Sequence, residues 1–214
     1  MDIHAPNEPI RSLKDFLYHM LTVVLGIVIA LSLEGMLEWG RHRRLVRETE
    51  EFLASEIRIN QARLEAGLAR APDAEKRLRQ AIRMAQNRQA KNKSKDPDTR
   101  LDLSFGLFPL NSTNWTEAQS SGALSLMDPV DVQHYTRIYV LQEHFLAMQD
   151  NTLGRWLELQ KWASFISDAK DLTGLDDREV DSFKEEAAAA LVYLQSEESI
   201  ARTLDDEYKK VSGH

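Results

Sequence analysis

The strongest feature of the hydrophobic pattern is an uncharged run of eighteen residues from Phe16 to Leu33, FLYHMLTVVLGIVIALSL. At about 1.5 Å per residue, a helix of this length covers roughly 27 Å, just enough to cross the hydrocarbon of a bilayer. Tyr18 and Trp39 stand near its ends, where amphipathic rings favour the headgroup layer. No small-residue cleavage site follows the run. The pattern therefore predicts an N-terminal tail over 1–15 and an uncleaved transmembrane anchor over 16–39.

Helical periodicity continues beyond the anchor, since neither Gly nor Pro occurs between Arg41 and Ala66. We expect a juxtamembrane helical rod over 40–71, mechanically continuous with the anchor. Asn60 lies within the apolar stripe of this rod, where a lone polar residue of a coiled coil sets register and partner number. The alternative is a globular-domain helix with Asn60 at the edge of its apolar face. The stripe consists of Val46, Leu53, Ile57, Leu64 and Leu68.

Apolar residues with a period near 3.6 recur through the rest of the chain and predict further helices. Gly67 and Pro72 break the rod, so we expect a helix over 73–88 that returns antiparallel to it. A short helix follows over 114–122, a longer one begins at Pro129 with a break near Gly154, and a last one opens near Asp176. No convincing strand pattern occurs. The fold class is therefore predicted to be all-α, with residues 72–214 forming a soluble antiparallel bundle of four or five helices.

A polar, basic and then apolar segment near 90–112 is predicted to be the longest loop. Loops of about twenty residues are uncommon in a compact domain unless they are functional or mobile. This loop is therefore the best candidate for a partner-binding segment, and the alternative is a solvated basic loop. Its candidate residues are Lys91, Lys93, Lys95, Phe105 and Phe108.

One face of the predicted anchor carries small or polar residues at every fourth position. Small residues at this spacing allow close approach of two helix backbones, and a carboxylate near the boundary is tolerated best against protein or water. We interpret this stripe as a helix-association face, although ordinary span residues give the same pattern. The face comprises His19, Thr22, Gly26, Ala30 and Glu34.

Charge and composition narrow the classes of function. The chain has 34 acidic and 27 basic residues and a net charge of −7, which disfavours nucleic acid as a partner. It has no cysteine, so thiolate nucleophiles and sulfur-ligated metals are excluded. No nucleophile elbow, phosphate-binding loop or calcium loop is recognisable, and His134 and His144 are too far apart on one helix to share a metal ion. We therefore predict no enzyme activity, no cofactor and no metal site.

Flanking charge bears on the orientation of the anchor. Arg11 and Lys14 precede it, whereas four arginines follow it between Arg41 and Arg47. The positive-inside rule therefore predicts a cytoplasmic C-terminal domain, with a periplasmic location as the alternative because long domains can cross regardless of charge.

Two segments resemble the recurrent blocks of a group of small bacterial single-span membrane proteins of unknown function. The first is the GI-x-IAL span with the acidic and aromatic boundary that follows it, and the second is the run STNWTEAQSSGALSL, in which Trp115 precedes Ser121, Gly122 and Leu124. The resemblance implies a bacterial inner-membrane location and a helical fold, and it carries no activity to transfer.

These observations together predict a non-enzymatic, membrane-anchored interaction or scaffold protein. It self-associates or acts as an accessory subunit of a larger membrane complex, so its expected partners are membrane lipid and either a second copy or that complex. The alternative is a membrane-tethered helical-bundle sensor, in which an apolar gap between helices takes up a small ligand.

Overall fold

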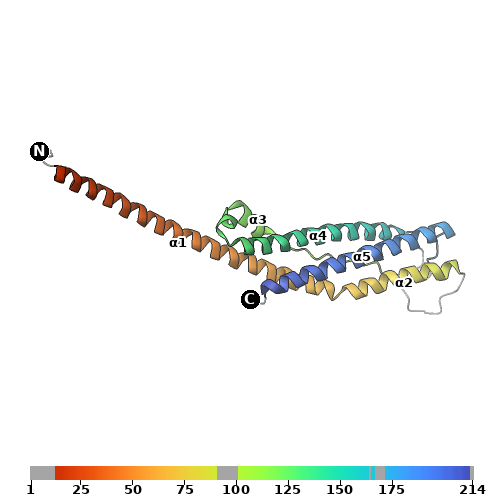
Figure 1. Cartoon of the computed structure of the whole chain (residues 1–214). Coiled ribbons are helices and arrows are strands. Elements are labelled where there is room, and N and C mark those ends of the chain that lie inside the picture. The colour runs from red at the N-terminus through yellow and green to blue at the C-terminus, as the bar shows by residue number, and fades with distance from the viewer. Residues whose placement is uncertain (1–12, 91–100, 164, 167–171, 213–214) are drawn as a thin grey trace, which may run out of the picture. The chain divides into compact units, whose positions relative to one another are not determined.

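A computed structural model describes residues 13–90, 101–163, 165–166 and 172–212 of the chain. These residues contain no β-strand and are mostly helical, which confirms the all-α prediction (Figure 1). The helices are α1 (Leu13–Leu68), α2 (Ala71–Gln89), α3 (Thr113–Ser120), the short 3₁₀ helix η1 (Ala123–Leu126), α4 (Pro129–Ala163) and α5 (Asp177–Ser212).

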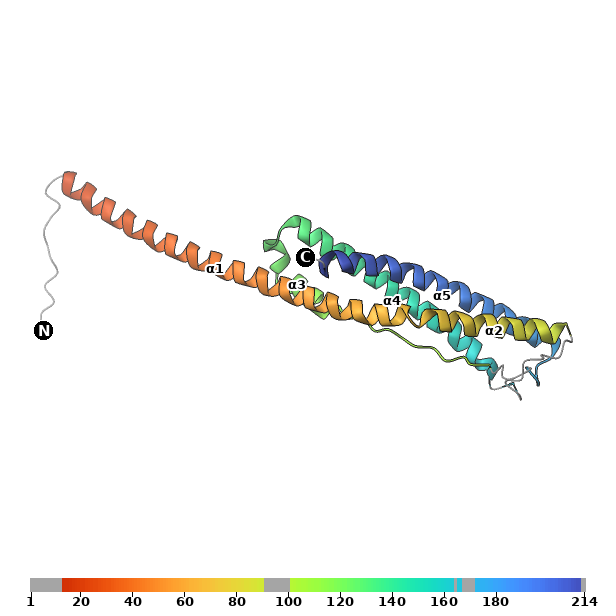
Figure 2. The same ribbon diagram turned by 90° about the horizontal axis from the view of Figure 1, so that it is seen from below.

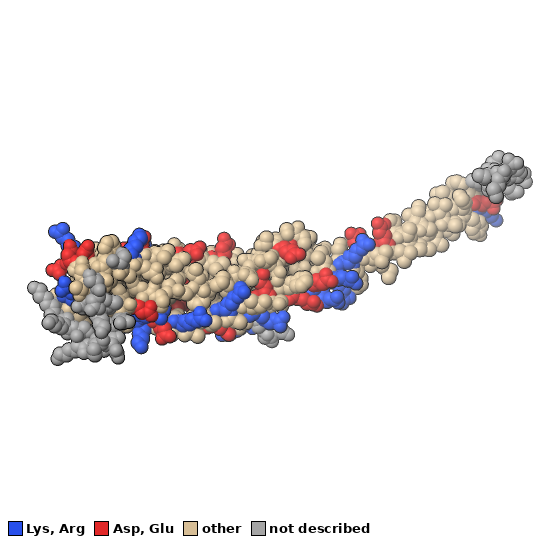
Figure 3. All heavy atoms as spheres, turned by 180° about the vertical axis from the view of Figure 1, so that it is seen from behind, with Lys and Arg blue, Asp and Glu red and all other residues tan. Residues whose placement is uncertain are grey.

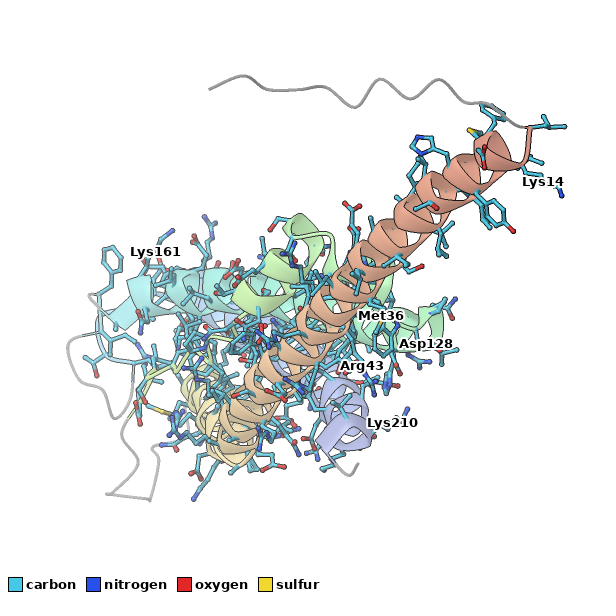
Figure 4. The ribbon with its side chains drawn as sticks, turned by 90° about the vertical axis from the view of Figure 1, so that its left-hand side faces the viewer. Lys14, Met36, Arg43, Asp128, Lys161 and Lys210 are labelled. Carbon is cyan, nitrogen blue, oxygen red and sulfur yellow. The ribbon has the colours of Figure 1, made fainter. Side chains whose placement is uncertain are left out.

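The chain divides into two compact units, Met1–Glu48 and Thr49–His214, and α1 contributes to both. In the first unit every described side chain from Leu13 to Arg44 is exposed. This part of α1 is long and apolar enough to cross a membrane. Figure 3 shows it as an uncharged stretch of surface with charged groups at each end, and Figure 4 labels Lys14 and Arg43 at those ends.

Two long antiparallel helices, α4 and α5, form the body of the second unit, and α2 packs beside α5 (Figures 1 and 2). The apolar stripes that the sequence predicted for α2, α4 and α5 meet in one core. Its fully buried side chains include Leu78, Ala85, Trp156, Leu159, Val180, Phe183 and Ala187. Fully burying a valine, leucine or phenylalanine side chain stabilises a fold by about 1.5–3 kcal/mol.

The second helix does not return along the first. Figures 1 and 2 show α2 extending beyond the end of α1 in the same general direction. Pro72 lies in the first turn of α2, where its missing N–H breaks no helical hydrogen bond. Backbone N–H groups of Arg70 and Ala74 donate to the carbonyls of Gly67 and Arg70, so the chain passes the proline with only a local break. The antiparallel return expected after Pro72 is therefore wrong.

Helices α4 and α5 begin where the sequence predicted, at Pro129 and next to Asp176, and an aspartate caps each of them. Asp128 Oδ1 accepts the N–H of Val130 at 2.8 Å, one residue after the helix begins at Pro129. Asp176 and Glu179 form a capping box, because Asp176 Oδ1 accepts the N–H of Glu179 while Glu179 Oε2 accepts the N–H of Asp176.

The break expected near Gly154 is absent, since α4 continues from Pro129 to Ala163. A helical glycine costs about 1 kcal/mol relative to alanine. The buried side chains of Thr152 and Trp156 flank this glycine and hold the helix in the core.

Candidate functional site

The described part of the long loop, residues 101–112, is a return connection. It contains no helix or strand and runs back along the second unit toward α3 (Figures 1 and 2). Twelve extended residues reach at most about 40 Å, which exceeds the roughly 28 Å length of a helix such as α2. The length of this loop follows from α2 pointing onward, because the chain must travel back before α3 begins. We call residues 101–112 the return segment.

Side chains of the bundle hold the backbone of the return segment. An extended segment without a strand partner must satisfy its N–H and C=O groups in another way. Asn60 does this for Asn111, donating from Nδ2 to the carbonyl at 2.7 Å and accepting the N–H on Oδ1 at 2.9 Å. Further along, the carbonyl of Leu103 accepts Trp156 Nε1 at 2.6 Å and Gln160 Nε2 at 3.0 Å.

Asn60 belongs to a buried polar network that connects α1, α4 and α5. Gln142 on α4 accepts hydrogen bonds from Asn60 Nδ2 at 3.1 Å and from the Tyr208 hydroxyl of α5. One turn before Asn60, Glu56 accepts the Tyr139 hydroxyl at 2.7 Å. Burial raises the pKa of both tyrosines, and the hydrogen bond to Glu56 raises that of Tyr139 further. These phenols therefore stay protonated and act as donors.

The structure shows Asn60 in a helix that packs within its own globular bundle, and its register role in a coiled coil stays a prediction. Its side chain is 0 % exposed and lies inside the bundle. Its side-chain amide bonds to Asn111 and Gln142 of its own chain. These contacts give Asn60 a role inside the bundle that requires no second copy.

A cavity of about 80 Å³ opens where α1 ends and α2 begins. The end of α1, the start of α2, the return segment and α5 all contribute to its wall. We call it the junction cavity. Its apolar lining includes Leu64, Gly67, Ala71, Phe105, Phe108, Phe145, Leu194 and Ala201, and its charged lining comprises Arg70, Arg77, Glu197 and Glu198.

Polar atoms at the junction cavity lack partners. Glu197 Oε2, Glu198 Oε1 and Arg77 Nε are buried without a hydrogen bond. Glu197 is 4 % exposed, and its other oxygen accepts Gln149 Nε2 at 3.3 Å. Burial raises the pKa of Glu197 above its ordinary value, although interactions with Thr152 and Gln149 act in the opposite direction.

Phe105 and Phe108, predicted for partner binding, pack against the bundle. The Phe105 ring lies 4.9 Å from the Trp156 ring, centroid to centroid. The Phe108 ring covers Gly67 so closely that a Cβ there would come within 2.8 Å of it. Both rings also line the junction cavity. Lys91, Lys93 and Lys95 lie outside the described residues.

The residues of the predicted association face are all exposed on α1: His19, Thr22, Gly26, Ala30 and Glu34. The Thr22 hydroxyl donates to the carbonyl of Tyr18 at 2.9 Å. Ser32 does the same to Val28 at 2.7 Å. Both hydroxyls are therefore hydrogen-bonded within the helix itself.

Sequence reasoning missed the acidic and amide side chains that line these sites, namely Glu56, Gln142, Gln149 and Glu197. A signal was present on α4, where Gln142 and Gln149 are seven positions apart and follow Ile138 and Phe145 by one turn each. Amides within an apolar stripe indicate buried hydrogen bonding. No comparable pattern marks Glu197 among the many acidic residues of α5.

No protein-family model, curated protein or solved structure matches the chain. The resemblance to small bacterial single-span proteins therefore stays a prediction. Function must be inferred from the residues themselves.

Proposed function

We propose that this protein is a single-span, membrane-anchored interaction protein, in which α1 fixes a non-enzymatic helical bundle to the bilayer. The observation that carries the proposal is the exposure of the first part of α1. Its large apolar side chains, such as Leu25 and Ile29, are more than half exposed. A continuous apolar surface of this kind needs lipid or another protein to cover it.

The ends of the exposed section support a membrane location. The Arg43 guanidinium lies 5.4 Å from the ring centroid of Trp39. Tryptophan and arginine together are typical of the boundary between hydrocarbon and water. Following the flanking charge, we place the bundle on the cytoplasmic side of a bacterial inner membrane, with the periplasmic side as the alternative.

Association within the membrane is the second part of the proposal. Gly26 and Ala30 present little side chain on one face of α1, which allows another helix to approach closely. That helix belongs to a second copy or to a larger complex of which this chain is an accessory subunit.

The test is the native mass of the full-length chain, extracted gently from its own membrane, with co-purifying proteins identified. We expect a discrete species larger than the 24.5 kDa chain and its detergent. Gly26→Leu combined with Ala30→Leu is expected to reduce that species to the monomer. Val24→Leu with Val28→Leu, on the opposite face, is the matched control. An unchanged mass in the first variant would eliminate the role of this face.

A second experiment tests whether the chain is anchored in the membrane at all. Alkaline carbonate removes peripheral proteins from membranes but leaves transmembrane proteins in place. We expect the full chain to remain in the membrane pellet. Its release into the supernatant would overturn the proposal, whatever the result of the mass measurement.

A further inference from the structure

We propose that the junction cavity binds a small organic cation, with an ammonium group at Glu197 and a short apolar body along the phenylalanine rings. This site lies wholly within the second unit and needs neither the membrane nor a partner protein. It therefore goes beyond the proposed function.

Glu197 is the first reason to expect a ligand. Its side chain is almost completely buried, yet Oε2 has no hydrogen bond. Leaving one buried polar group unsatisfied costs about 1–3 kcal/mol, and more for a charged group. Among the described residues, no lysine or arginine forms an ion pair with Glu197. A positively charged donor in the cavity would satisfy this oxygen and supply the missing charge.

The unpartnered oxygens of Glu197 and Glu198 favour a cation over an anion in this cavity. Arg77 Nε has no hydrogen bond, but its Nη2 donates to the carbonyl of Ser104 at 3.2 Å, and Asp102, 3.9 Å from Nε, balances the charge of the guanidinium. Glu198 has only a long contact of 3.7 Å with Arg202, and its Oε1 is buried and unpartnered. Two carboxylate oxygens therefore await donors, which an ammonium group with its several N–H bonds can provide.

The walls of the cavity suit the rest of such a ligand. Phe105, Phe108 and Phe145 contribute rings, whose faces attract cations, and Leu64 and Leu194 contribute aliphatic surface. A volume of about 80 Å³ is smaller than a cavity of about 150 Å³ that holds benzene. The site therefore fits an alkylammonium with a few carbon atoms.

The test uses the full-length chain in detergent micelles and three probes of equal length: n-butylammonium chloride, 1-butanol and sodium butyrate. Binding is followed by amide chemical shifts of Gly67 and Gly106, at constant chloride and ionic strength. We expect saturable shifts with butylammonium in the millimolar range, because a ligand of about five heavy atoms buries little surface. Butanol should bind at least tenfold more weakly, and butyrate should not bind.

Two variants locate the site. Glu197→Gln should weaken butylammonium binding at least tenfold, whereas Glu185→Gln, an exposed position on the same helix, should leave it unchanged. Ala71→Leu keeps both carboxylates but fills the cavity, and it should also abolish binding. This second variant preserves the test if Glu197→Gln alters the fold.

Three results would overturn the proposal. Equal binding of butanol and butylammonium would indicate an apolar cavity without charge selectivity, and binding of butyrate would show that the sign is wrong. No saturable shift with any probe would leave water as the only occupant.

Discussion

The two units treat apolar and polar side chains in opposite ways, although one helix contributes to both. In the first unit, Val24 and Ile27 of α1 are about half exposed. In the second, Asn60 and Glu56 of the same helix are buried, and both make hydrogen bonds to other segments. In a water-soluble protein, apolar side chains are normally buried and polar side chains normally exposed. The difference is what the proposed function requires, in which lipid or protein covers the first section, whereas the second section packs around an internal polar network.

The two sections of α1 also differ in what they require of the amino-acid sequence. The first section needs only length and hydrophobicity, which any sequence of similar composition supplies. The second depends on particular partners, because each buried amide or carboxylate must meet a matching group. Substitutions should therefore have small effects on folding in the first unit and large, residue-specific effects in the second.

The largest expected effect is that of Trp156→Ala. Trp156 is fully buried, lies beside Phe105 and donates to the carbonyl of Leu103. Removing such a side chain typically lowers the free energy of unfolding by about 3–5 kcal/mol. Urea unfolding of the full chain in micelles, followed by near-ultraviolet circular dichroism, measures it.

Leu25→Ala is the control for this substitution in the other unit. It also removes a large apolar side chain, but Leu25 is 56 % exposed. We expect no measurable change in the unfolding of the bundle. A loss comparable to that of Trp156→Ala would show that the two sections of α1 do not differ as we describe.

A smaller loss is expected from Asn60→Ala. The substitution removes both hydrogen bonds to Asn111, so its N–H loses its acceptor while its carbonyl keeps Gln142 Nε2, and the loss should be about 1–3 kcal/mol. Amide hydrogen exchange should accelerate at Asn111 and Asn114. Arg58→Ala, at an exposed position of the same helix two residues before Asn60, is the control.

The oligomeric state of the Asn60 variant separates the two roles considered for this residue. If Asn60 only holds Asn111 and Gln142 of its own chain, Asn60→Ala should lower the stability and leave the native mass unchanged. A register-setting residue of a coiled coil predicts a changed number of copies. The second outcome would contradict the role that the hydrogen bonds assign.

Local sequence patterns were enough to predict the helical class, the helices α2, α4 and α5, and the starts of α4 at Pro129 and of α5 near Asp176. Those features depend on neighbours within one or two turns. The direction of α2 was missed because Pro72 is compatible with either a sharp return or a shallow break. The attachment of the return segment was missed because Asn60 and Asn111 are 51 positions apart, and no local pattern links them.

Because Gly67 lies against the Phe108 ring, Gly67→Ala should change the free energy of unfolding by about 1 kcal/mol. Alanine normally stabilises a helix by about this amount relative to glycine. Here the added Cβ would meet the Phe108 ring at 2.8 Å, so the ring must move and Gly67→Ala should destabilise the bundle. In a Phe108→Ala background the same change should instead be stabilising. Unfolding free energies of the four proteins of this double-mutant cycle measure the reversal, and equal effects in both backgrounds would contradict the contact.

The smallest expected effect is a dependence on pH that Glu197 introduces into the second unit. Burial raises the pKa of Glu197 above 4.5, so between that value and the raised one the folded protein binds more protons than the unfolded chain. Linkage then requires the free energy of unfolding to fall as pH rises through this window. Glu197→Gln removes the titration, and it should make the bundle relatively more stable toward neutral pH.

The difference between wild type and Glu197→Gln isolates this contribution, because the other titrating groups remain in both proteins. Burial also raises the pKa of Glu198, but that residue is retained in the variant. Urea midpoints between about pH 4 and pH 8 should therefore converge at the acid end and diverge toward neutrality. Parallel curves would mean that Glu197 ionises in the folded protein as readily as in water. In that case the carboxylate of Glu197 already has a hydrogen-bond partner or enough water. Glu197 would then not differ from buried polar side chains of the bundle such as Asn60 and Gln142, which have partners.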